Sequence, residues 1–135
     1  MNASTNTPLS GRAILVVEDA YWIAADVGRT LKRAGAHVIG PVPYVEQALA
    51  AITRSRVHAA VLDVNLGGVP SFAVARELER HAIPYLLATG YDRRALPGRW
   101  QEAIRIDKPF KANELIDVLS RMLCTADQPF VGEEH

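Results

Sequence analysis

The chain has 135 residues, with fifteen basic and fifteen acidic side chains and a formal net charge of zero. A chain of this length forms one domain with its own core, and its balanced charge gives no reason to expect binding to DNA or to an anionic membrane. No apolar run approaches the roughly 20 residues that span a bilayer, and the polar N-terminus lacks the features of a signal peptide. Because Cys124 is the single cysteine, an internal disulfide is excluded and a cytoplasmic location is expected.

The first half of the chain alternates short apolar runs with amphipathic segments. Residues 1–11 are mostly small and polar and are predicted to form a disordered leader. The apolar periodicity then predicts, in order, a strand over about 13–17, a helix over 21–34, a short strand over 37–39 and a helix over about 44–54. Trp22 lies at the start of the first of these helices and is expected to pack in the core or at its rim.

The second half continues the same alternation. It predicts a strand over about 59–63, a helix over 72–81, a strand over 84–88, a strand over 103–107 and a helix over about 112–123. Ser71 is placed to cap the 72–81 helix with its hydroxyl. Residues 92–102 should form at most a short or irregular helix, because Pro97 and Gly98 interrupt the pattern. Residues 125–135 are polar and acidic and are expected to be a flexible tail.

Five strands that alternate with helices indicate an α/β fold. Right-handed crossovers between parallel strands place helices on both faces of the sheet, so we expect a doubly wound parallel sheet in one domain.

Three acidic residues follow two of the predicted strands. Glu18 and Asp19 come directly after the first strand, and Asp63 ends the strand over 59–63. If these strands are parallel neighbours, the three carboxylates meet at one edge of the sheet, where open α/β sheets place their chemistry. Like charges at such distances conflict unless a counter-charge is present. The pattern therefore indicates a pocket for a divalent cation, with Asp63 as the reacting group.

Polar residues that follow successive predicted strands occur in an order that resembles a known family. An acidic pair after the first strand, Asp63 after the third, Thr89 after the fourth and Lys108-Pro109 after the fifth together resemble the receiver domain of bacterial two-component response regulators. The resemblance covers about residues 12–124 and implies the flavodoxin-like strand order 2-1-3-4-5. The stretch Leu87-Ala88-Thr89-Gly90-Tyr91 is similar to the FATGUY subgroup of receivers, which are often stand-alone domains.

The resemblance also implies a metal site. Asp19 and Asp63 would be direct ligands of Mg²⁺ or Mn²⁺, the backbone carbonyl of Asn65 a third ligand, and Glu18 a ligand mainly through water. Such oxygen ligands suit a hard cation that keeps several waters.

Asp63 would then be the phosphoacceptor, and its carboxylate would attack phosphorus to form an aspartyl phosphate. The resemblance gives Lys108 and Thr89 the role of binding the phosphoryl oxygens, while Gly90 leaves space beside the threonine hydroxyl. It further implies a cis peptide bond between Lys108 and Pro109. Taken singly, these residues have ordinary explanations, such as a helix N-terminus for Glu18 and Asp19 or a solvated charge for Lys108.

Four positions are expected to tune the switch: Asn65, Gly90, Tyr91 and Arg105. Many receivers carry an aromatic residue three positions before the lysine, but this chain has Arg105 there, and a guanidinium is not easily buried without a partner. We therefore expect phosphorylation to reorder residues 90–102 while Arg105 exchanges partners at the surface. Asn65 and Tyr91 flank the site and are expected to set the rate of phosphate loss.

The predicted function is that of a single-domain response regulator. Its partners would be a sensor histidine kinase or a histidine phosphotransfer protein and a downstream protein target, with a weak homodimer as one route of output. A phosphate-independent interaction module on the same fold is the alternative. An aspartate-based phosphatase, which would act as an enzyme on external substrates, is disfavoured because Asn65 stands where it would need a second Asp.

Overall fold

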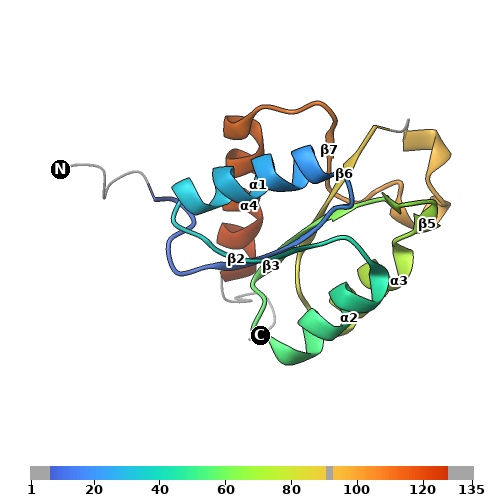
Figure 1. Ribbon diagram of the computed structural model, residues 1–135, viewed down its shortest axis with the longest axis horizontal. Coiled ribbons are helices and arrows are strands. Elements are labelled where there is room, and N and C mark those ends of the chain that lie inside the picture. Colours follow the sequence, from blue (N-terminus) through green and yellow to red (C-terminus); the bar gives the residue numbers. More distant parts are fainter. Residues whose placement is uncertain (1–6, 91–92, 128–135) are drawn as a thin grey trace, which may run out of the picture.

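The computed structural model describes residues 7–90 and 93–127. Its centre is a five-stranded parallel sheet in the order β2-β1-β3-β6-β7 (Figure 1). The strands are β1 (Ala13–Val17), β2 (His37–Val42), β3 (Ala59–Asp63), β6 (Tyr85–Thr89) and β7 (Arg105–Asp107). Since β6 and β7 are the fourth and fifth strands of this sheet along the chain, the predicted flavodoxin-like order 2-1-3-4-5 is confirmed.

Two helices cover each face of the sheet, as Figure 1 shows. The helices are α1 (Tyr21–Arg33) and α4 (Ala112–Asp127) on one face, and α2 (Val45–Arg54) and α3 (Phe72–Arg80) on the other. Alternate residues of β1 serve the two cores: Ile14 lies in the cluster with α1 and α4, and Leu15 in the cluster with α2 and α3. Because both faces are covered, every residue of β3 is buried, which explains its unbroken apolar sequence before Asp63.

Two segments contain more regular strand structure than the sequence pattern indicates. A two-stranded hairpin, β4 (Asn65–Leu66) and β5 (Val69–Pro70), follows β3 in a segment where the apolar periodicity predicts no strand. Strand β2 continues past residue 39 to Val42 through a cis Gly40–Pro41 peptide bond. Gly40 has a φ of +94°, and a Cβ there would lie 2.7 Å from the backbone nitrogen of Val42, so only glycine fits this bend.

The segment before β7 is irregular, as predicted. It contains two 3-10 turns, η2 (Arg93–Ala95) and η3 (Gly98–Trp100). Trp100 anchors the second turn, because its buried ring stacks on Phe72 of α3 at a centroid distance of 4.3 Å. Its Nε1 donates a hydrogen bond of 3.0 Å to the hydroxyl of Tyr85.

The prediction of disorder up to residue 11 is wrong for residues 7–11, and residues 1–6 lie outside the described part of the chain. Leu9 is fully buried in the cluster with α1 and α4, and its backbone nitrogen donates a 2.9 Å hydrogen bond to Ala34. One apolar side chain thus ties the segment before β1 to the core.

The C-terminal boundary also differs from the prediction of a tail from residue 125. Helix α4 continues to Asp127, and the rest of that predicted tail lies outside the described residues.

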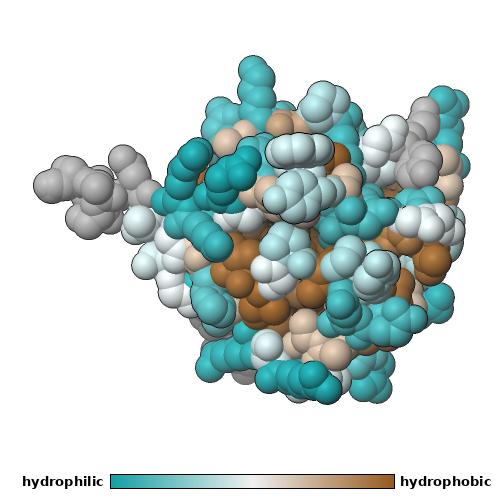
Figure 2. Space-filling view, viewed as in Figure 1, coloured by the Kyte–Doolittle hydropathy of each residue, from teal (hydrophilic) through white to brown (hydrophobic). Residues whose placement is uncertain are grey.

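Figure 2 shows hydrophobic surface across the middle of the molecule, where Figure 1 shows the edge of the sheet and β2. Strand β2 is an edge strand, and its residues are exposed or only half-buried. The more polar surface surrounds this area and includes the exposed side of α1 (Figure 2).

Candidate functional site

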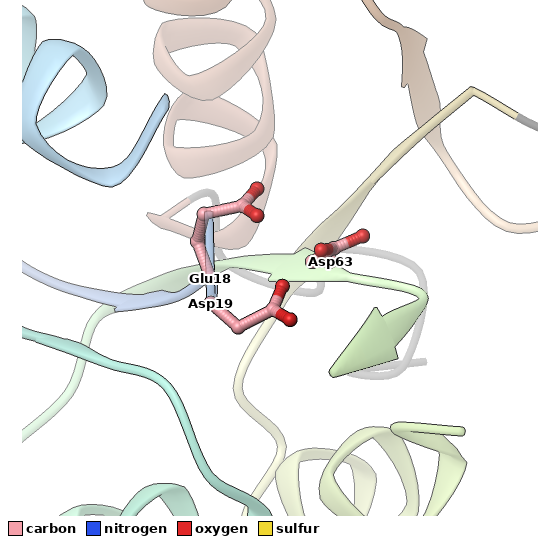
Figure 3. Close-up of side chains that lie close together, drawn as sticks. All are labelled: Glu18, Asp19 and Asp63. Carbon is pink, nitrogen blue, oxygen red and sulfur yellow. The ribbon is translucent and has the colours of Figure 1, made fainter. Parts of the chain in front are cut away.

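Three carboxylates converge at the carboxyl edge of the sheet. Glu18 and Asp19 follow β1, Asp63 ends β3, and the two strands pair in parallel with Val17 beside Leu62. The residue after Val17 therefore lies beside Asp63, and carboxylate oxygens of all three residues lie within 4.8 Å of one another. Figure 3 shows these carboxyl groups gathered around one space. Glu18 and Asp63 are buried, whereas Asp19 is exposed.

Lys108 places a cation against two of these acids. Its Nζ lies 2.9 Å from Glu18 Oε1 and 3.4 Å from Asp63 Oδ1. The backbone positions it, because β7 pairs with β6 and the nitrogen of Lys108 donates a 2.9 Å hydrogen bond to the carbonyl of Thr89. The Lys108–Pro109 peptide bond is cis, which confirms that prediction.

Burial and neighbouring charge shift the ionisation of Asp63. Burial raises the pKa of Asp63 most, and hydrogen bonding and charge repulsion from Glu18 raise it further, to about 7. Lys108 and the Asn65 backbone nitrogen, 3.4 Å from Asp63 Oδ1, oppose this rise of the pKa without cancelling it. Burial alone would lower the pKa of Lys108, but its hydrogen bond to Glu18 and the charge of Asp63 outweigh burial, so that pKa is raised. The site thus carries more negative charge than its single lysine balances.

The donor set fits a hard divalent cation. Three carboxylates within reach of one point offer the oxygen ligands that Mg²⁺ and Mn²⁺ prefer, and a cation there would remove the charge conflict that raises the pKa of Asp63. Glu18 also has a local role, since its Oε2 accepts a 3.1 Å hydrogen bond from the backbone nitrogen of Ala20 at the start of α1.

The remaining predicted residues lie around this edge. Thr89 is buried at the end of β6, one position beyond Ala88, which pairs with Asp63. Gly90 follows it, and a Cβ there would meet nothing within 4 Å, in keeping with the predicted open space. Tyr91 lies outside the described residues.

Arg105 lies at the start of β7 with its side chain largely buried, not at the surface as predicted. Its Nε and Nη2 both donate hydrogen bonds to Asp107 Oδ1, the former at 3.1 Å. An acid two residues along the same strand thus compensates the buried guanidinium, because alternate residues of a strand share a face.

Two features near Asp63 were missed from the sequence. The amide oxygen of Asn65 accepts a 2.6 Å hydrogen bond from the nitrogen of Gly68, so this side chain closes the hairpin turn. Ser71 precedes α3 but makes no side-chain cap, and its hydroxyl instead donates to the carbonyls of Asp63 and Val64. The pair Gly67-Gly68 between Leu66 and Val69 is a recognisable hairpin signal, whereas no local pattern indicates the partner of Ser71.

Trp22 also differs from its prediction. Its side chain is 80% exposed and meets the ring of Tyr21 edge to face, so it packs neither in the core nor at its rim. No helix among the described residues is long and apolar enough to cross a membrane.

Comparison with known proteins shows the fold. No family model matches the chain. The transcriptional regulatory protein TcrA of Mycobacterium tuberculosis is 37% identical over 83 residues, which are 60% of this chain and 32% of TcrA, so the chain spans about a third of the length of that curated relative.

Among solved structures, the receiver domain of sensor histidine kinase PA1611 from Pseudomonas aeruginosa, which holds a magnesium ion in its active-site cleft, is 26% identical with a TM-score of 0.72. That match covers 85% of this chain and 99% of the other. The response regulator PhyR of Brucella abortus matches with a TM-score of 0.79 and 23% identity over 92% of this chain and 53% of its own. The chain therefore has the fold of response-regulator receiver domains.

Proposed function

We propose that this chain is a receiver that accepts a phosphoryl group on Asp63 from a histidine kinase or a histidine phosphotransfer protein. The observation that carries the proposal is the convergence of Glu18, Asp19, Asp63 and Lys108 from three separate segments at one edge of the sheet. Residues 12–124 would form the receiver unit, and a stand-alone protein of the FATGUY subgroup is the form that we favour.

The chemistry is an in-line transfer between two protein side chains. An ionised oxygen of Asp63 attacks the phosphorus of a phosphohistidine, a P–O bond forms, and the P–N bond breaks with its electron pair left on the imidazole, which takes up a proton. Lys108 stabilises the negative charge on the phosphoryl oxygens, and the Thr89 hydroxyl donates to one of them. A bound Mg²⁺ or Mn²⁺, held by Asp19, Asp63 and the Asn65 carbonyl with Glu18 through water, would neutralise charge on the acids and on the phosphoryl group.

The phosphodonor would approach over α1. A groove of about 640 Å³ runs beside the site between Trp22, Ile23 and Asp26 of α1 and Lys108–Phe110. Trp22 lines this groove, and its exposed ring meets the exposed ring of Tyr21 edge to face; large exposed aromatic side chains favour protein contact. The output would also leave by protein contact, to a downstream target or through a weak homodimer, without DNA binding.

We infer that phosphorylation reorders the segment 90–102 and that Arg105 then changes partner from Asp107. The support is the irregular backbone of residues 93–102 and the absence of an aromatic residue at position 105. Asn65 and Tyr91 would set the rate at which the phosphoryl group is lost. Amide hydrogen exchange with and without a phosphoryl mimic tests the rearrangement, and unchanged protection over 93–102 would contradict it.

The direct test is intact mass after incubation with Mg²⁺ and acetyl phosphate. Wild type should gain one phosphoryl group that hydroxylamine removes, and Asp63→Asn should gain none. Asp117→Asn is the matched control, because Asp117 is an exposed acid on α4 that pairs with Arg121 and has no part in the site, so phosphorylation should stay intact. If wild type accepts phosphate neither from acetyl phosphate nor from a phosphorylated histidine protein, the phosphoacceptor role is wrong and the fold serves as a phosphate-independent interaction module.

A further inference from the structure

Ser71 lies out of reach of solvent behind the site. It is fully buried, with an exposed fraction of 0%, between the end of β5 and the start of α3. Its backbone nitrogen donates a 2.9 Å hydrogen bond to the carbonyl of Val64. Its hydroxyl lies 2.5 Å from the carbonyl oxygen of Asp63 and 3.1 Å from that of Val64, so its single proton is shared between two consecutive carbonyls.

These bonds close a loop that begins and ends at the site. Residues 63–71 leave the sheet at Asp63, form the β4–β5 hairpin and return to Ser71. Asn65 is held from two further directions, because its nitrogen faces Asp63 Oδ1 and its amide oxygen binds the nitrogen of Gly68. Asn65 directly follows Asp63 and Val64 in the chain, so its backbone position also depends on the two carbonyls that the Ser71 hydroxyl holds.

We propose that Ser71 is a positioning residue for divalent-cation binding. Its hydroxyl fixes the backbone of Asp63 and Val64 and so sets the places of the Asp63 carboxylate and of Asn65, whose carbonyl is the proposed third ligand. This inference rests on the proposed function, because it concerns the same metal site. Groups that orient metal ligands from behind typically change metal affinity by about 10–100-fold when they are removed.

A purely structural serine would behave differently. The loss of one buried hydroxyl that donates to a carbonyl lowers the unfolding free energy wherever the hydroxyl lies, and it has no reason to change metal affinity. Metal affinity and stability must therefore be measured separately.

The test is calorimetric titration of the whole chain with Mg²⁺ alone, with urea unfolding of the same metal-free samples. Ser71→Ala should bind Mg²⁺ about 10-fold more weakly than wild type. Thr53→Val is the control, since the Thr53 hydroxyl also donates to two backbone carbonyls, those of Leu49 and Ala50, but lies in α2. It should leave the affinity unchanged. Phosphorylation of Ser71→Ala should be slow at low Mg²⁺ and approach the wild-type rate at saturating Mg²⁺.

The isosteric pair Ser71→Thr and Ser71→Val separates the hydroxyl from the fit of the side chain. Threonine and valine have nearly the same size, and both are larger than the buried serine. Only threonine keeps the hydroxyl that donates to the carbonyls, so Ser71→Thr should bind Mg²⁺ several-fold more tightly than Ser71→Val. This pair decides the matter if Ser71→Ala does not fold. Equal affinities within the pair, or a Ser71→Ala affinity within about twofold of wild type, would overturn the inference, since removal of such a group should cost at least about 10-fold.

The outcomes also separate this inference from the proposed function. Wild type that binds Mg²⁺ but never gains phosphate contradicts the phosphoacceptor role and leaves the role of Ser71 testable by titration. Wild type that gains phosphate, together with Ser71→Ala of unchanged affinity, overturns the role of Ser71 alone. Wild type that does not bind Mg²⁺ overturns both.

Discussion

Replacing Asp63 by Asn should stabilise the metal-free protein at high pH. Burial and Glu18 raise the pKa of Asp63 from its ordinary value of 3.8 to about 7, so the folded state resists the ionised form. Between these two pH values the folded chain holds a proton that the unfolded chain has released. Protonated Asp63 therefore makes its full contribution to the unfolding free energy below about pH 4. This contribution is lost as the pH rises towards 7. Asparagine carries no charge at any of these pH values and avoids the loss.

The size of the effect follows from the shift of the pKa. A difference of about three pKa units corresponds to at most about 4 kcal/mol of unfolding free energy. The carboxylates open towards solvent on the Asp19 side, and screening there lowers the expected gain to about 1–2 kcal/mol at pH 8.

The assay is urea unfolding of wild type and Asp63→Asn at pH 4, 6 and 8 in the presence of EDTA. The variant should exceed wild type most at pH 8 and match it near pH 4, and Mg²⁺ should narrow the difference at pH 8 by stabilising wild type. Asp19→Asn is the control, because that carboxylate is exposed and its loss should change stability less. A variant that is less stable than wild type at pH 8, or a difference that does not vary with pH, would refute the reasoning.

Three further changes probe the fold around the site. Leu9→Ala should lower the unfolding free energy by about 2–4 kcal/mol, because its fully buried side chain leaves a cavity; an unchanged urea midpoint would contradict the assignment of residues 7–11 to the core. Tyr85→Phe removes the hydroxyl that joins Glu79 to Trp100 and should lower the unfolding free energy by about 1 kcal/mol and speed amide exchange at 98–100, whereas equal exchange would show that stacking alone holds this turn. Lys108→Met removes the cation that lies against the buried Glu18 and Asp63 and should lower the urea midpoint at pH 7, whereas an unchanged midpoint would show that these ion pairs do not stabilise the fold.

The central strands, and the edge of the sheet where the acids meet, could be predicted because short stretches of the sequence indicate them. A strand that is covered on both faces must be apolar throughout, so β1, β3 and β6 appear in the sequence as unbroken runs. The first polar residue after each run then lies at the carboxyl edge, and parallel pairing brings such residues together. This reasoning located the three acids, whereas Lys108 follows the polar strand β7 and was assigned through the resemblance to receiver domains.

The burial of single side chains was less predictable, because it depends on which elements of the fold surround each side chain. Leu9 is an apolar residue in a mostly polar leader, and only its packing in the cluster with residues of α1 and α4 makes it part of the core. Trp22 has a large aromatic side chain of the kind that packs in cores, yet its position on α1 exposes it to solvent. The surroundings of Leu9 come from elements far along the chain, so the local pattern carries no signal there, whereas Trp22 lies on the side of α1 that faces away from the core.

The sequence by itself determined the fold class and which acids meet at the edge of the sheet, because both follow from periodicity and from the direction of parallel strands. Only the tertiary structure decided what those residues touch: Lys108 between Glu18 and Asp63, Arg105 against Asp107, and the Ser71 hydroxyl on the backbone behind Asp63. Hydrogen bonds depend on distances of a few tenths of an ångström and on direction, and these are set by the packing of all the elements at once.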